Sequence, residues 1–93
     1  MFKKLNPLLH AQLRLKIISL LVKEGQSDFV ELKEKTKATS GNLSIQLKKL
    51  EEAEYVRIEK GYKDNYPHTS VRITSTGLQA FEEYVEALKD YFE

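Results

Sequence analysis

Two side-chain amides, those of Asn42 and Gln46, lie one helical turn apart after Thr39 and could bind the edges of base pairs. A carboxamide donates and accepts hydrogen bonds at once, which matches the pattern that adenine presents in the major groove of a duplex. Between them, Ser44 can donate or accept, and Ile45 could contact a thymine methyl group. Each good bidentate pair discriminates by about 1–3 kcal/mol, so this residue set predicts modest sequence specificity. The alternatives are that Asn42 is only a helix cap and that Gln46 is only a solvated surface residue.

Basic residues around the same segment could bind the phosphates of a duplex. Lysines that neutralise phosphates release condensed counterions, and this release supplies much of the binding free energy. The start of a helix adds backbone N–H donors and the positive end of the helix dipole, and Thr39 and Ser40 could add hydroxyl donors there. The lysine candidates are Lys37, Lys48, Lys49, Lys60 and Lys63. The alternative for the adjacent pair is two exposed lysines that are balanced by the two glutamates after them.

Composition and motif content argue against several other functions. The chain has 93 residues, 41% hydrophobic and 31% charged, as is typical of one globular domain. No apolar run approaches the roughly 18 residues of a membrane span, no signal peptide is evident, and we expect a cytoplasmic protein without a membrane partner. There is no cysteine, and the two histidines, His10 and His68, are far apart, so we expect no metal and no cofactor. Since no nucleophile–base pair or phosphate-binding loop is evident, we do not expect an enzyme.

Charge is unevenly distributed along the chain. Residues 74–93 carry five acidic side chains and one lysine, for a net charge of −4, whereas residues 1–73 carry +5. Such asymmetry is expected when one face of a protein meets phosphates and another meets protein. A solvated helix that happens to be acidic is the open alternative.

Local signals predict two helices in the first 37 residues. Asn6 is a good N-cap, and the proline after it suits the first helical position, so a helix should begin there and end at Gly25. Its leucines and isoleucines form two stripes, which indicates that it packs against two partners. Asp28 and Glu31 have the spacing of a capping box, which predicts a short second helix that ends near residues 36–37.

The next segments predict the element that carries the amides and a hairpin after it. Thr39 should begin a third helix that runs to about residue 53, with Leu43, Leu47 and Leu50 facing inward. Residues 55–60 and 70–74 alternate as strands do. The intervening residues 61–69 are expected to form a loop that is too long for a tight turn and that can reach away from the body. Residues 27–29 could add a very short strand.

The last helix should begin at residues 74–76 and carry an apolar seam. Its large apolar side chains recur at spacings of three and four residues, as in helices that pair with another helix. The seam residues are Leu78, Phe81, Val85, Leu88 and Phe92, and Ala80, Tyr84, Ala87 and Tyr91 are expected to widen the stripe. The predicted fold class is therefore mainly α with a small β-hairpin, in the order α-α-α-β-β-α.

The chain resembles the winged helix-turn-helix transcriptional regulators, especially the short dimeric archaeal and bacterial type related to the multiple-antibiotic-resistance regulators. The most specific match is residues 42–56, Asn-Leu-Ser-Ile-Gln-Leu-Lys-Lys-Leu-Glu-Glu-Ala-Glu-Tyr-Val, which is similar to a recognition helix running into the first wing strand. Residues 5–17 and 28–33 resemble the first two helices, and residues 72–78 resemble the junction between wing and last helix. The resemblance covers essentially residues 1–93 as a single winged-helix domain.

This resemblance implies a sequence-specific regulator of transcription that binds double-stranded DNA as a homodimer on a pseudo-palindromic operator. The helix at residues 39–53 would enter the major groove, and the wing at residues 61–69, with Lys63 and His68, would contact the backbone or minor groove. The N- and C-terminal helices would form the dimer interface, in which Leu5, Leu8 and Leu9 join the apolar seam. Repression is the expected role, because the sequence shows no separate activation or effector domain.

Three departures from the family pattern keep two other functions open. Ile45 occupies a position on the groove side that is often basic or polar, Glu54 stands where glycine is usual, and the wing is weakly basic. One alternative is a winged-helix module that contacts another protein of the transcription machinery. The other is an architectural DNA binder with little sequence preference. A small-molecule effector is compatible with the sequence, but no residue pattern points to one.

Overall fold

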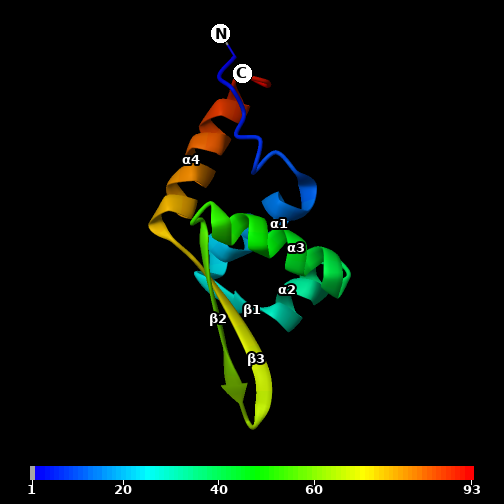
Figure 1. Ribbon diagram of the computed structural model, residues 1–93. Helices are drawn as coiled ribbons and strands as arrows, with labels where there is room; N and C mark the ends of the chain where they lie inside the picture. The colour runs from blue at the N-terminus through cyan, green and yellow to red at the C-terminus, as the bar shows by residue number, and fades with distance from the viewer. Residues whose placement is uncertain (1) are drawn as a thin grey trace.

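Four helices and a three-stranded antiparallel sheet make up the computed structural model, which describes residues 2–93 (Figure 1). In chain order, the elements are α1 (Gln12–Glu24), β1 (Gln26–Asp28), α2 (Phe29–Thr36), α3 (Ser40–Glu52), β2 (Val56–Lys63), β3 (Tyr66–Ile73) and α4 (Ser75–Lys89). The strands lie in the order β1-β3-β2. The predicted fold class is confirmed, and the short strand before the second helix is present. Within residues 2–93, no helix is long and apolar enough to span a membrane.

The core lies where α1, α2 and α3 pack together on the base of the sheet (Figure 1). Leu43, Leu47 and Leu50, the predicted inner stripe of α3, are all buried. The β2–β3 hairpin extends from the core in one direction, and α4 with the N-terminal segment extends in the opposite direction. The molecule is therefore elongated, at 53 × 24 × 21 Å. The fully buried large side chains are Leu9, Ile17, Ile18, Leu21, Leu32, Leu43, Leu50, Val56 and Val71.

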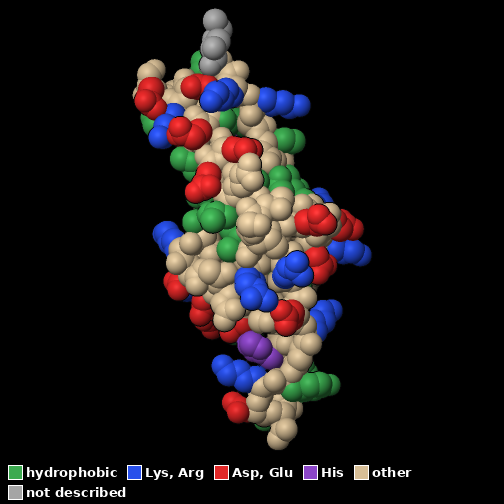
Figure 2. All heavy atoms as spheres, turned by 90° about the vertical axis from the view of Figure 1, so that its left-hand side faces the viewer, with side chains coloured by type: hydrophobic (Ala, Val, Ile, Leu, Met, Phe, Trp, Pro, Cys, Tyr) green, Lys and Arg blue, Asp and Glu red, His purple; other side chains and the backbone are tan. Residues whose placement is uncertain are grey.

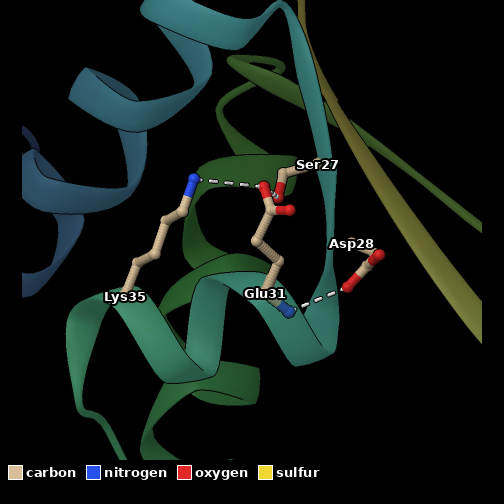
Figure 3. Close-up of polar contacts among 4 residues, drawn as sticks. All are labelled: Ser27, Asp28, Glu31 and Lys35. Carbon is tan, nitrogen blue, oxygen red and sulfur yellow. Dashed lines mark hydrogen bonds and ion pairs between the residues drawn. The ribbon is translucent and has the colours of Figure 1, made fainter.

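Asp28 begins α2, and its Oδ1 accepts a 2.8 Å hydrogen bond from the Glu31 backbone N–H (Figure 3). The predicted capping box is only half formed, because the Glu31 carboxylate instead accepts from Ser27 Oγ at 2.7 Å and from Lys35 Nζ at 3.5 Å. The backbone hydrogen bond from Glu31 is the main cause that lowers the pKa of Asp28. His68, with Nε2 3.5 Å from Oδ2, lowers it further, and partial burial opposes both effects. Ionised Asp28 therefore stabilises the start of α2.

Replacing this cap should destabilise the protein in a pH-dependent way. We expect Asp28→Ala to lower the free energy of unfolding by about 1 kcal/mol at pH 7, because the cap is lost. A lowered pKa in the folded state means that the carboxylate's contribution is complete above its unfolded pKa and is lost as the pH falls through the folded value. In urea unfolding, the difference in the free energy of unfolding between Asp28→Ala and wild type should therefore become smaller below about pH 4. Asp28→Asn, which keeps a capping oxygen, is the control; a deficit of Asp28→Ala that persists undiminished to pH 2 would contradict this.

The first helix begins later than predicted. Asn6 caps only a short turn, with its Oδ1 accepting from the Leu8 backbone N–H at 2.9 Å, and α1 starts at Gln12 after the extended residue Ala11. In a continuous helix the Leu8 carbonyl would accept from the Gln12 N–H. Here it accepts from Arg14 Nε at 2.6 Å. The prediction of one helix from residue 7 onward is wrong: the backbone is extended at Ala11, and a side chain occupies the Leu8 carbonyl in place of a helical N–H.

The hairpin closes with a tight turn, so the predicted long loop at residues 61–69 is wrong. Strands β2 and β3 pair continuously as far as Lys63 and Tyr66. Between them, Asp64 and Asn65 have φ angles of 53° and 68°. Positive φ at both central residues is the requirement of a type I′ turn, whose twist matches that of a hairpin, and Asp and Asn tolerate this conformation. The strands therefore extend through the residues that were expected to form the loop.

Helix α4 uses one face to pack against its own chain and leaves another exposed. It begins at Thr74, whose Oγ1 accepts from the Gly77 backbone N–H at 3.0 Å. The inward face consists of Gly77, Ala80, Tyr84 and Ala87. Ala80, Tyr84 and Ala87 were expected to widen the apolar seam; all three are buried within the chain, and Ala80 and Tyr84 belong to its core. The predicted seam is divided: Phe81 and Leu88 pack against the core, whereas Leu78, Val85 and Phe92 are exposed.

Candidate nucleic-acid interface

The outer side of α3 is bare. Thr39 caps the helix by accepting the Asn42 backbone N–H on its Oγ1 at 3.1 Å, so its hydroxyl hydrogen stays available to a ligand. Nine residues of α3 are exposed on this side; two are acidic, Glu51 and Glu52, and we call the other seven the groove face: Ser40, Gly41, Asn42, Ser44, Ile45, Lys48 and Lys49. Ile45 is 56% exposed without a partner side chain to cover it. All predicted contact residues of α3 except Gln46 therefore lie on one accessible surface.

Gln46 is half-buried at the border between α3 and α1. Its Oε1 accepts a 2.6 Å hydrogen bond from Arg14 Nη1, and its Nε2 donates to Asn42 Oδ1 at 3.0 Å. Arg14 is a residue that sequence analysis missed, because it lies 32 positions from Gln46 and no local pattern connects the two. The two candidate base-reading amides are therefore bonded to each other and to a third element.

An open hollow of about 790 Å³ separates the groove face from the wing strands. Lys48 from α3 and Lys60 from β2 lie on its lining, together with the hydroxyls of Ser44 and Thr69. Cations and hydroxyls facing a common groove are the donors that a sugar–phosphate backbone requires. Glu51 also lines the hollow and reduces its positive charge.

The two predicted wing residues differ in their surroundings. Lys63 is exposed beside the turn, opposite Tyr66 in the register. His68 lies further back on β3, where its Nε2 is 3.5 Å from the Asp28 carboxylate. Tyr62 and Tyr66 are both exposed, so neither covers the hairpin. Contact of Lys63 and His68 with DNA stays a prediction, and the structure gives His68 a partner within its own chain.

The residues expected at a subunit interface fall into two groups. Leu78, Val85 and Phe92 lie exposed along one side of α4, with Val85 37% and Phe92 72% exposed. The half-buried residues Phe81, Leu88, Leu5 and Leu8 pack against the core. Leu9 is fully buried inside its own chain and cannot contribute to an interface, which corrects the prediction for this residue.

Exposed aromatic side chains also lie where the N-terminal segment meets the end of α4. The rings of Phe2 and Tyr91, both exposed, lie 4.8 Å apart between centroids. His10 Nδ1 lies 2.9 Å from the Tyr84 hydroxyl, which further ties the segment to α4. Figure 2 shows hydrophobic side chains among acidic ones in the upper part of the molecule, where α4 and the N-terminal segment lie. We call Phe2, Leu78, Val85, Tyr91 and Phe92 the α4 patch.

Comparison with known proteins identifies the fold's relatives. The family of the winged helix DNA-binding domain matches residues 13–92. An uncharacterized protein of Methanocaldococcus jannaschii is 40% identical over 72 residues, which cover 77% of this chain and 78% of that protein. A transcriptional regulator homologue from Pyrococcus horikoshii superimposes with a TM-score of 0.84 and 27% identity, over 90% of this chain and 83% of its own. A mutant of MarR from E. coli, complexed with operator DNA, gives a TM-score of 0.75 at 21% identity, over 88% of this chain and 58% of its own.

Proposed function

The chain belongs to the winged helix DNA-binding domain family, and from this premise we propose that it is a homodimeric repressor that binds a specific duplex operator. The family consists of DNA-binding regulators of transcription, which are not enzymes, and the fold is that of the multiple-antibiotic-resistance regulators. The observation that carries the proposal is the bare groove face of α3, whose inward leucines are buried while its polar and basic side stays free. Repression needs only that the operator be occupied.

The groove face and the wing offer complementary contacts to a duplex. The start of α3 presents backbone N–H groups and a positive dipole end, while Lys48 and Lys49 lie further along the same side. Lys60 of β2 lies on the opposite side of the hollow, and Lys63 is exposed beside the turn at the tip of the wing. A phosphate backbone between α3 and the wing would meet cations from both. Ile45 would contact a thymine methyl group, which explains an exposed isoleucine on a polar surface.

A dimer is supported by the α4 patch, which exposes aromatic and aliphatic side chains at the end of the molecule opposite the wing (Figure 1). Exposed large apolar side chains gathered at one end of a molecule are typical of a surface that binds another protein. Pairing two copies through it would place two α3 helices for half-sites about one helical turn apart. Each half-site discriminates modestly between sequences, and two half-sites bound together discriminate well enough to define an operator.

Binding to labelled duplexes at several salt concentrations tests this function. We expect a preference of at least several-fold for one pseudo-palindromic site selected from random duplexes, with affinity that falls as salt rises. Equal binding to all sequences with a steep salt dependence would indicate an architectural binder instead. No binding near 100 mM salt would indicate a module that contacts protein.

Removing the two groove-face lysines should weaken binding to all sequences alike. For the double variant Lys48→Ala/Lys49→Ala we expect up to about tenfold loss of affinity for each lysine near 0.1 M salt, because counterion release is lost. The slope of log affinity against log salt should become shallower by about 2, with the preferred sequence unchanged. Lys23→Ala, in the last turn of α1, is the matched control and should leave the slope as it is. A slope identical to wild type in the double variant would show that neither lysine contacts phosphate.

A further inference from the structure

We propose that Arg14 fixes the orientation of the Gln46 and Asn42 amides, so that Asn42 presents a hydrogen-bond donor to an acceptor edge of guanine or thymine in each half-site. This proposal rests on the proposed DNA-binding function and assigns its readout. It contradicts the adenine pairing that the sequence alone suggested for Asn42.

A continuous chain of hydrogen bonds connects the N-terminal turn to the recognition helix α3. Arg14 Nε donates to the Leu8 carbonyl at 2.6 Å, and Arg14 Nη1 donates to Gln46 Oε1 at 2.6 Å. Gln46 Nε2 then donates to Asn42 Oδ1 at 3.0 Å. Arg14 is half-buried and anchored at both ends, so its guanidinium is held in place. Hydrogen bonds from a charged guanidinium are shorter and stronger than neutral ones.

The guanidinium determines the direction of every bond after it. Arginine has five N–H donors and no acceptor, so only the oxygen of the Gln46 amide can face Arg14. The Gln46 nitrogen must then face Asn42, and a nitrogen that donates requires the Asn42 oxygen as its acceptor. A glutamine or asparagine with no fixed neighbour could present either end of its amide. Here a donor-only residue outside α3 removes that freedom.

At the protein surface, the Nδ2 donor of Asn42 is free, whereas its Oδ1 acceptor already has a hydrogen-bond partner. Asn42 is exposed, and its Oδ1 already accepts from Gln46, so its Nδ2 group is the end available to a ligand. In the major groove, guanine offers two neighbouring acceptors, N7 and O6, and thymine offers O4, whereas adenine offers its N7 acceptor beside the N6 amino donor. Bidentate pairing with adenine would require Asn42 Oδ1 to accept from the N6 amino group as well as from Gln46. Adenine therefore gains less binding free energy from Asn42 than guanine or thymine does. The readout thus favours guanine or thymine opposite Asn42.

Reversing the direction of the hydrogen bond between residues 46 and 42 should reverse the preference for the base opposite Asn42. In Gln46→Glu, the carboxylate still accepts from Arg14 but has no donor for Asn42, which must turn its Nδ2 towards the carboxylate and expose Oδ1. Random-duplex selection should then change the preferred base at one half-site position from guanine or thymine to adenine or cytosine, which carry amino donors. Gln12→Glu makes the same chemical change at an exposed position of α1 outside the groove face and should retain the wild-type preferred base. An unchanged preferred base in Gln46→Glu would overturn the proposal.

A second pair of variants tests the role of Arg14 itself. Arg14→Met should relax the preference at that base position by about fivefold or more, whereas Lys16→Met, which removes the same charge from α1, should retain it. Arg14→Lys, which keeps a donor for Gln46, should restore part of the preference. An Arg14→Met variant with the wild-type preference would refute a positioning role.

A measurement on the free protein separates this inference from the proposed function. The side-chain amide NMR signals of Gln46 and Asn42 should shift and lose exchange protection in Arg14→Met but not in Lys16→Met. If wild type selects no preferred site, the proposed sequence-specific function fails, and these signals still decide whether Arg14 orders the amides. Signals that are unchanged in Arg14→Met would overturn the inference even if wild type binds a specific operator.

Discussion

Val85→Glu is expected to convert the proposed dimer into a monomer and to weaken operator binding by a factor of 100 or more. Val85 lies at the middle of the α4 patch, between Leu78 one heptad before it and Phe92 one heptad after it, and 37% of its surface is exposed in the single chain. A carboxylate there would lose its water shell on pairing without gaining a partner cation. Two linked half-site contacts exceed one by factors of about 10² to 10⁴, so loss of the dimer removes that gain.

Sedimentation at fixed protein concentration and binding to the selected operator would measure both effects. Gln79→Glu is the matched control, because it adds the same charge to an exposed position on another side of α4. The Val85→Glu variant should keep a monomer's weak, salt-dependent affinity for unrelated duplexes, since the groove face is untouched. A variant that still sediments as a dimer would show that the subunits meet elsewhere.

Gly77→Ala should destabilise the protein by overpacking the junction between β3 and α4. A Cβ at this position would lie 2.2 Å from the Tyr55 carbonyl oxygen and 3.0 Å from the Tyr55 carbonyl carbon, both backbone atoms that cannot rotate away. The same carbonyl accepts from the Thr74 N–H at 3.0 Å, so moving it disrupts the junction between β3 and α4. Overpacking of this kind costs about 1–3 kcal/mol. For a domain of this size, that corresponds to a fall of about 5–20 °C in Tm.

Displacement of Tyr55 in Gly77→Ala should also disturb the N-terminal segment, because the Tyr55 hydroxyl accepts a hydrogen bond from Asn6 Nδ2 at 2.9 Å. Thermal unfolding at one protein concentration tests this, since dimerisation would otherwise shift Tm by mass action. Gly41→Ala is the control: nothing lies within 4 Å of its added Cβ, and alanine is the better helix former, so Tm should stay or rise. A Gly77→Ala variant as stable as wild type would mean that α4 can move outward at little cost.

The sequence was sufficient for three helix caps and for the inward side of α3, which depend on residues within about one turn of each other. The caps at Asp28, Thr39 and Thr74 are formed by side chains that bond to the backbone three residues later, and such spacing is visible in a sequence. The leucine stripe of α3 is a repeat of three and four, and it correctly predicted which side faces the core. The bare groove face follows directly from that stripe.

Local pattern failed where a distant group competes with a local one. The helix expected from residue 7 is interrupted at the extended residue Ala11, and Arg14 binds the carbonyl that the helix would have used. The predicted loop became paired strand because two adjacent residues of the turn, Asp64 and Asn65, accept positive φ, whereas composition alone suggested an irregular segment. On α4, both apolar sides satisfy a helical repeat, and only packing decided that Tyr84 faces inward while Val85 faces out.

The sequence by itself thus determined the order of the elements, the helix caps and the exposed side of α3, because each depends on residues at most a few positions apart. Only the tertiary structure decided that Arg14 orients Gln46 and Asn42, that Gly77 lies against Tyr55, and that Leu9 is enclosed in the core. Those contacts join residues far apart along the chain. Their geometry comes from how α1, α3 and the β3–α4 junction pack, and no spacing along the sequence specifies that packing.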